Sequence, residues 1–132
     1  MGKLDVLSGT GGPWFYLVFR LLVGLLFFMH GWTKFAGEQA PSGLFLAAGI
    51  IELAAGAGVF LGLFTRGLAL IGAIEMAVAF FMVHVKSGLS GLNPLTNQGE
   101  PAVLFFVAFL VLLIYGAQKW SLEQKLLKKE LF

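Results

Sequence analysis

The sequence predicts an all-α fold, an integral membrane four-helix bundle that ends in a short amphipathic helix at the membrane interface. Of its 132 residues, 58% are hydrophobic and only 12% are charged, and the mean hydropathy is +0.89. A soluble domain of this size needs more polar residues to cover its surface. The long apolar runs are continuous rather than alternating, which favours membrane helices over the strands of a barrel.

Four apolar runs are long enough to cross a bilayer core, which takes about 20 residues. We expect them to lie in one membrane domain, residues 1–132, with spans at about 13–33, 43–64, 67–86 and 101–119. Pro13 and Pro101 suit the first turn of a helix, where the missing N–H costs little. The first two connections are short, so the first three helices should be antiparallel neighbours. The last connection is longer and polar, and it can cap one end of the bundle.

An even number of spans places both termini on one side of the membrane. Cations are concentrated on that side, which favours a cytoplasmic location for both termini. The positive net charge is therefore explained by membrane topology rather than by a nucleic-acid partner. The cations expected on the terminal side are Lys3, Arg66, Lys119, Lys125, Lys128 and Lys129, against Lys34 and Lys86 on the other side.

The tail, residues 120–132, predicts a short amphipathic helix. Ser121 and Gln124 have the spacing of a capping box. Apolar residues of the tail can rest at the membrane interface while its lysines meet anionic headgroups. These apolar residues are Trp120, Leu122, Leu126 and Leu127.

The chain contains no cysteine. This excludes disulfides, a thiol nucleophile, cysteine-ligated zinc or iron–sulfur clusters, and covalently attached c-type haem. The N-terminal region lacks the small-residue cleavage site of a signal peptide, so we expect the first span to be retained.

Three ionisable residues are isolated within apolar runs: Arg20, Glu52 and Glu75. Such residues usually face the interior of a bundle, where they are paired or functional. One alternative is a structural ion network of these three; the other is direct contact with a ligand. One arginine cannot pair simply with two acids, so Glu52 is also a candidate proton carrier. Small residues share the helical face of Glu52 and predict close helix packing there: Ala48, Gly49, Ala55 and Gly56.

A second polar group is expected at the end of the bundle opposite the termini. Its candidate catalytic residues are His30, Lys34 and Glu100, and its candidate ligand-binding residues are His84, Lys86, Asn93 and Asn97. In a continuous α-helix His84 would face away from Glu75, because nine residues correspond to about two and a half turns. The pattern therefore favours His30 over His84, unless the helix end unwinds.

Three segments together resemble the DoxX family of small membrane proteins. They are "FRLLVGLLFFMHGWTKF", the isolated Glu52 followed by "GLFTRG", and "GEPAVLFFVAFLVLLIYGAQKWSLE". The resemblance implies a four-helix bundle in the bacterial cytoplasmic (inner) membrane, related to the small subunit of thiosulfate:quinone oxidoreductase and to membrane components of oxidative-stress complexes. It maps onto Arg20, Gly24, His30, Gly31, Lys34, Glu52, His84, Gly99 and Glu100.

We therefore expect a quinone-linked membrane redox protein or a membrane subunit of an oxidoreductase complex. His30 or Lys34 would bind a carbonyl of an isoprenoid quinone, and Glu100 or Glu52 would supply a proton. No electron carrier is recognisable in the sequence, so a protein partner or another electron donor is expected. The alternative is a noncatalytic scaffold that anchors a partner protein.

A third alternative is haem or a metal held by His30 and His84, helped by Met29, Met82 or Glu100. The sequence favours it least, because these side chains lack dense ligand spacing. A transporter is not indicated, since no inverted repeat is visible. The glycine-rich helix faces also allow a homodimer.

Overall fold

The computed structural model describes residue 9, residues 11–86 and residues 88–129. Within these residues the chain is helical and contains no strand, which confirms the predicted fold class. The helical elements are α2 (Gly12–Phe35), α3 (Gly43–Leu61), α4 (Thr65–Ala79), the π-helix η2 (Phe80–His84), the 3-10 helix η3 (Gly88–Leu92), α5 (Glu100–Tyr115) and α6 (Leu122–Leu127).

Three helical segments are long and apolar enough to cross a membrane: α2, α3 and the continuous stretch of α4 and η2. The fourth, α5, is apolar but has only 16 residues. At 1.5 Å per residue it is about 24 Å long, which is less than the roughly 30 Å of a bilayer core. The helix ends four residues before the end of the expected span, about 101–119, because Gly116 adopts a positive φ of 72° and stops the helix.

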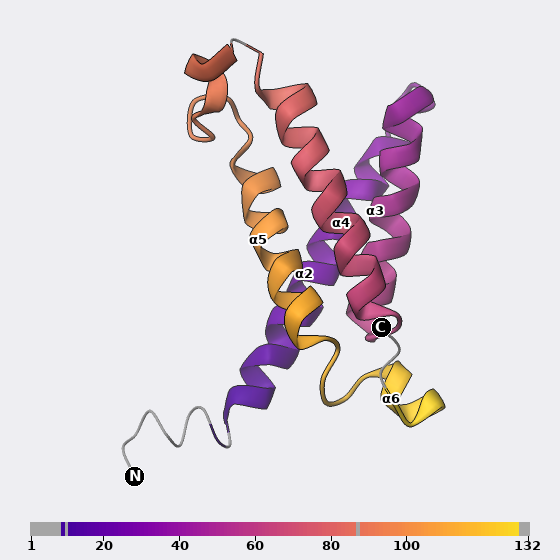
Figure 1. Ribbon diagram of the computed structural model, residues 1–132. Helices are drawn as coiled ribbons and strands as arrows, with labels where there is room; N and C mark the ends of the chain where they lie inside the picture. Colours follow the sequence, from indigo (N-terminus) through magenta and orange to yellow (C-terminus); the bar gives the residue numbers. More distant parts are fainter. Residues whose placement is uncertain (1–8, 10, 87, 130–132) are drawn as a thin grey trace.

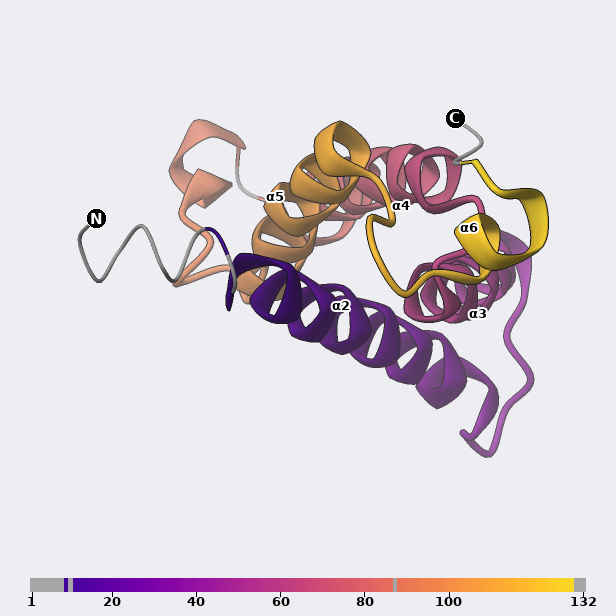
Figure 2. The same cartoon turned by 90° about the horizontal axis from the view of Figure 1, so that it is seen from below.

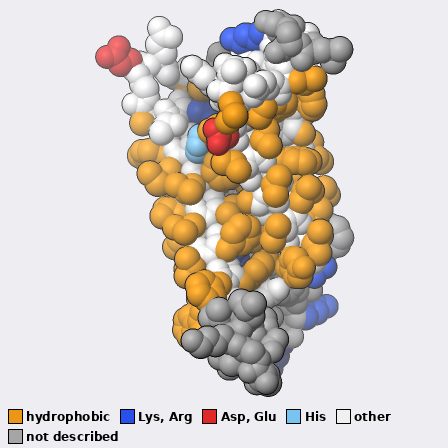
Figure 3. All heavy atoms as spheres, turned by 90° about the vertical axis from the view of Figure 1, so that its left-hand side faces the viewer, with side chains coloured by type: hydrophobic (Ala, Val, Ile, Leu, Met, Phe, Trp, Pro, Cys, Tyr) orange, Lys and Arg blue, Asp and Glu red, His pale blue; other side chains and the backbone are white. Residues whose placement is uncertain are grey.

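The elements form an upright bundle with its polar connections at two ends (Figure 1). At one end lie residues 36–42, 85–86 and 88–99, which we call the loop end. At the other end lie the beginning of α2, the turn between α3 and α4, and residues 116–129, which we call the tail end. The side view in Figure 3 shows a broad hydrophobic surface between the two ends. Lipid is the environment that such an exposed apolar surface requires.

Helices α2 and α3 pack through glycines, so that their backbones touch. A Cβ atom added at Gly24 would lie 2.8 Å from the carbonyl oxygen of Gly56, and one added at Gly56 would collide with the backbone of Phe28. One added at Gly49 would meet the ring of Phe35. The predicted close packing on the Glu52 face of α3 is therefore confirmed.

Between α2 and α5, aromatic side chains fill the space instead of backbone contacts. Phe27 of α2 lies 5.2 Å from Phe105 and 4.6 Å from Phe109 between ring centroids. Phe27 and Phe109 are fully buried. Phe109 also packs on Gly72, where an added Cβ would meet its ring, so these rings join α2, α4 and α5 into one core.

The tail folds against the bundle and is not simply laid on the membrane surface. The amide of Glu123 donates to the carbonyl oxygen of Gly62, in the turn between α3 and α4, at 3.1 Å. Ser121 and Glu123 are buried, and Figure 2 shows α6 at the ends of α3 and α4. The hydroxyl of Ser121 accepts from the amide of Gln124 at 3.3 Å, which confirms the predicted helix cap. Residues 130–132 of the expected amphipathic tail lie outside the described residues.

Candidate functional site

An open pocket of about 470 Å³ lies at the loop end. Its walls combine an imidazole, an ammonium, hydroxyl and amide groups, and an apolar residue that continues onto the lipid-facing surface. The lining residues are Val83, His84, Lys86, Gly91, Thr96, Asn97 and Gln98.

The position of His84 depends on a change of helix type. The last turn of this helix, Phe80–His84, is a π-helix, closed by a bond from the amide of Val85 to the carbonyl oxygen of Phe80 at 3.0 Å. A π-turn contains more residues than an α-turn, so the side chains that follow face a new direction. The sequence argument against His84 assumed a continuous α-helix and allowed an exception for an altered helix end, and the π-helix is such an exception.

Asn97 holds the pocket loop in shape and fixes the His84 ring. Its side chain donates to the carbonyl oxygen of Gly91 at 2.7 Å and accepts from the amide of Gly99 at 2.7 Å. The backbone carbonyl oxygen of Asn97 lies 3.2 Å from Nδ1 of His84. Because a carbonyl oxygen can only accept, Nδ1 carries the proton and Nε2 is the acceptor nitrogen of the neutral ring.

The remaining members of the expected cluster lie outside this pocket. His30 is exposed on α2 and meets the edge of Phe105 at 5.3 Å between ring centroids. Asn93 uses its side chain to accept from the amide of Leu95 at 3.0 Å, a bond that stabilises the loop turn. Glu100 is exposed at the first residue of α5. The structure thus brings His84, Lys86 and Asn97 together and leaves His30, Asn93 and Glu100 apart.

Lys34 forms an ion pair with Glu52 inside the bundle. Its Nζ lies 2.5 Å from Oε2 of Glu52, and the two side chains are 15% and 4% exposed. The Lys34 ammonium also lies 5.2 Å from the centre of the Phe45 ring. Glu75 of α4 interacts electrostatically with both Lys34 and Glu52. Its two carboxylate oxygens are buried and have no hydrogen-bond partner.

Arg20 is buried and binds backbone carbonyl groups at the tail end. Its guanidinium donates to the carbonyl oxygens of Ala117 at 2.5 Å, Lys119 at 3.4 Å and Trp120 at 2.9 Å. One turn earlier on α2, the hydroxyl of Tyr16 donates to the carbonyl oxygen of Gly116 at 2.6 Å. The segment after α5 is therefore fastened to α2 by two side chains.

The expected ion network of Arg20, Glu52 and Glu75 is wrong in its pairing. Lys34 is the partner of Glu52, and Glu75 has no hydrogen bond to Arg20. The reason is depth: Arg20 lies against Gly62 at the tail end, whereas Glu52 lies beside Gly31, three turns further along α2.

Comparison with known proteins agrees with the resemblance seen in the sequence. The DoxX family profile matches residues 15–85. An uncharacterized protein of Haemophilus influenzae is 36% identical over an alignment of 126 positions, and the aligned region covers 89% of this chain and 94% of that protein. The chain belongs to the DoxX family.

Two more distant relatives were also found. An uncharacterized membrane protein of Mycobacterium tuberculosis is 28% identical over 89% of this chain and 85% of its own length. A Bacillus subtilis protein named "Putative oxidoreductase CatD" is 27% identical over 81% of this chain and 83% of its own length. No solved structure matches the chain.

The DoxX match covers the intramembrane charges and His84 but stops before most of the pocket. Arg20, Lys34, Glu52 and Glu75 all lie within residues 15–85. The other pocket residues from Lys86 to Gln98 lie beyond it. Sequence reasoning missed Thr96 and Gln98 as lining residues, although the polar loop that contains them was recognised as a possible cap.

The part of the chain that is described contains no cluster of side chains that could ligate a metal ion. No group of three or more His, Cys, Asp or Glu side chains comes together there. His30 and His84 have separate surroundings, the first beside Phe105 and the second beside Asn97.

Proposed function

We propose that this DoxX protein is a quinone-linked membrane redox protein, acting alone or as the membrane subunit of an oxidoreductase complex. The observation that carries the proposal is the loop-end pocket, where polar side chains meet an apolar surface that faces lipid. Val83 lines this pocket and is 54% exposed. An isoprenoid quinone needs both surroundings, since its head is polar and its tail belongs in lipid. The name of the Bacillus subtilis relative, an oxidoreductase, is consistent with redox chemistry.

The pocket residues fit a quinone head group by their chemistry. A quinone has two carbonyl oxygens that accept hydrogen bonds and become hydroxyl groups on reduction. Lys86 and Thr96 offer donors for one of them. His84 can form a hydrogen bond with the second quinone oxygen as acceptor or as donor. Its Nε2 accepts from a hydroxyl when the ring is neutral and donates to a carbonyl when the ring is protonated. His84 is therefore the proposed acid–base group, in place of His30.

The buried carboxylates offer a second place for protons. Glu52 is engaged by Lys34, whereas Glu75 has no hydrogen-bond partner for either oxygen. We therefore assign the role of proton carrier to Glu75 rather than to Glu52. Lys34, near the loop end of α2, would link this site to that side of the membrane.

Electrons must come from outside the described side chains, from a protein partner or a soluble donor. We place the protein in the bacterial cytoplasmic membrane with the tail end toward the cytoplasm. Besides the buried Arg20, five cations lie at the tail end among the described residues, against two at the loop end, as the positive-inside rule requires. The tail-end cations are Arg66, Lys119, Lys125, Lys128 and Lys129, and those of the loop end are Lys34 and Lys86. A homodimer is compatible with this arrangement.

The test is mass spectrometry of quinones that copurify with the protein in a mild detergent. The chain offers a matched pair of variants, His84→Gln inside the pocket and His30→Gln outside it. Removing one hydrogen bond to the head group should lower quinone retention about tenfold in His84→Gln. His30→Gln should retain quinone as the wild type does. Size-exclusion profiles and circular dichroism establish that both variants fold.

The outcomes separate the alternatives. Loss of quinone in His30→Gln alone would move the site to the surface beside Phe105. A wild-type protein without enriched quinone would refute the proposal and favour the noncatalytic scaffold, and a visible absorption spectrum of the same sample would reveal haem.

A further inference from the structure

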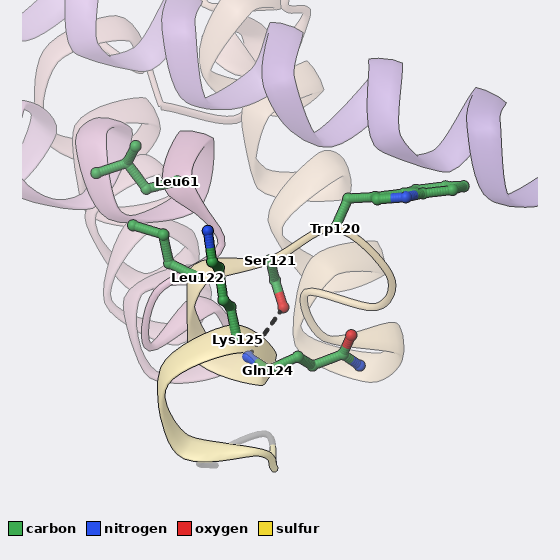
Figure 4. A pocket seen from close by; sticks show the side chains of 6 residues that line it. All are labelled: Leu61, Trp120, Ser121, Leu122, Gln124 and Lys125. Atoms are coloured by element: carbon green, nitrogen blue, oxygen red, sulfur yellow. Dashed lines mark hydrogen bonds between the residues drawn. The ribbon is translucent and has the colours of Figure 1, made fainter.

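A second pocket lies at the tail end, on the opposite side of the membrane from the first. Its volume is about 490 Å³, and Figure 4 shows its walls. Apolar side chains from α3 and from the tail form one part, and the polar side chains of Ser121 and of α6 form the other. The lining residues are Leu61, Trp120, Ser121, Leu122, Gln124 and Lys125.

Two observations place this pocket at the depth of lipid headgroups. Leu61 is the last residue of the membrane-spanning helix α3 and is 46% exposed. Trp120 stacks on Trp14, near the start of α2, with 4.3 Å between ring centroids. Tryptophan side chains concentrate at the boundary between hydrocarbon and headgroups. The apolar wall of the pocket is therefore continuous with the surface that faces acyl chains.

Lys125 gives the pocket an uncompensated positive charge. The Lys125 side chain extends along the wall toward Leu61 (Figure 4). In the part of the chain that is described, Lys125 has no carboxylate partner, since the ion pair found there joins Lys34 and Glu52. Ser121 and Gln124 lie beside it and add a hydroxyl and an amide.

The charges around the pocket also favour an anionic occupant. Lys119, Lys128 and Lys129 are exposed at the same end. Glu123, the acidic residue of α6, is only 1% exposed, so its carboxylate does not face the pocket as a competing anion. An exposed basic surface at the membrane boundary attracts anionic lipids.

We propose that this pocket binds one phospholipid with an anionic headgroup, such as phosphatidylglycerol. Lys125 binds the phosphate or the headgroup charge, with Ser121 and Gln124 as hydrogen-bonding neighbours. Leu61 and Leu122 contact the first part of an acyl chain. The occupant is a membrane lipid rather than a soluble anion, because half of the lining is apolar and opens toward the hydrocarbon layer. This site is independent of the quinone proposal, since the two pockets share no residue.

Native mass spectrometry of the detergent-purified protein tests the proposal directly. Phosphatidylglycerol or phosphatidylcholine with identical acyl chains is added, and the bound fraction is measured. The wild type should bind phosphatidylglycerol about fivefold more tightly, which is the usual effect of one lysine near an anionic headgroup. Lys125→Gln should abolish this preference. Lys119→Gln removes the same charge from the same end without touching the pocket and should keep the preference.

Additional variants and a competing soluble anion separate the proposal from its alternatives. Lys125→Arg keeps the charge and should keep the preference, which separates a charge effect from damage to folding. Equal loss in Lys119→Gln would overturn the proposal, because it would indicate general attraction to the basic surface. Equal binding of the two lipids by the wild type would also overturn it. Displacement of the lipid by an equal concentration of glycerol phosphate would refute the lipid as occupant and indicate a soluble anion.

Discussion

The Lys34–Glu52 ion pair makes a quantitative prediction about stability. The two side chains are 15% and 4% exposed, and their charged atoms are 2.5 Å apart. Breaking a buried ion pair by removing one partner typically costs about 3 to 5 kcal/mol, because the remaining charge stays buried. The cost should differ between the two partners, since they differ in access to water.

Glu52→Leu should be the milder change. Lys34 lies one residue before the end of α2, so its flexible side chain can turn toward the loop end when Glu52 is absent. We expect Glu52→Leu to lower the free energy of unfolding by about 2 to 3 kcal/mol. Lys34→Met leaves Glu52 nine residues inside α3, with a short side chain that cannot reach the surface, and should cost about 3 to 5 kcal/mol.

The double variant Lys34→Met/Glu52→Leu should recover most of the loss, to within about 1 kcal/mol of the wild type, because apolar side chains replace the pair. Reversible unfolding in mixed micelles, followed by tryptophan fluorescence and circular dichroism, measures these differences. Arg20→Met/Glu52→Leu is the matched comparison and should lose the sum of its two single changes. Recovery in that variant, or additive losses in Lys34→Met/Glu52→Leu, would refute the pairing described above.

Three other changes test separate features of the bundle. Arg20→Gln should lower stability by about 2 to 3 kcal/mol and expose the segment after α5 to proteolysis, because carbonyl groups lose a charged donor; unchanged cleavage would contradict this. Gly56→Val should prevent α2 and α3 from closing and cost more than about 2 kcal/mol by thermal unfolding, whereas Gly37→Val, in open surroundings, should be neutral. Glu75→Leu should keep or raise the unfolding midpoint, because no hydrogen bond is lost. A clear fall in the unfolding midpoint would contradict this and show that the Glu75 carboxylate makes a stabilising contact.

The sequence was sufficient to predict the fold class because apolar run length and composition determine whether helices span a membrane. It also predicted the small-residue face of α3 and the Ser121 cap, since both depend on local spacing. The pairing of Glu52 was not predictable in the same way. Helical periodicity gives the face of a residue but not its depth relative to a neighbouring helix. The seven-residue connection between α2 and α3 allows several registers, and the glycine contacts select the one that brings Lys34 to Glu52.

The loop-end pocket was only partly predictable for a different reason. Polar residues in a long loop indicate a possible site, and Lys86 and Asn97 were found in that way. The direction of His84 depends on the π-turn before it, which apolar periodicity does not reveal. His30 and Glu100 share the same end of the bundle, but a common end does not bring side chains into contact.

The shortness of α5 explains why a buried arginine lies eight residues inside an apolar helix. Because α5 stops at Tyr115, the chain continues at the membrane boundary as irregular backbone, with positive φ angles at Gln118 and Trp120. Irregular backbone at this depth is stable only where its polar groups are satisfied within the protein. Tyr16 and Arg20, one turn apart on α2, donate to carbonyl groups from Gly116 to Trp120. The charge thus replaces the hydrogen bonds that a longer helix would have made, and it holds Trp120 and Ser121 where they line the tail-end pocket.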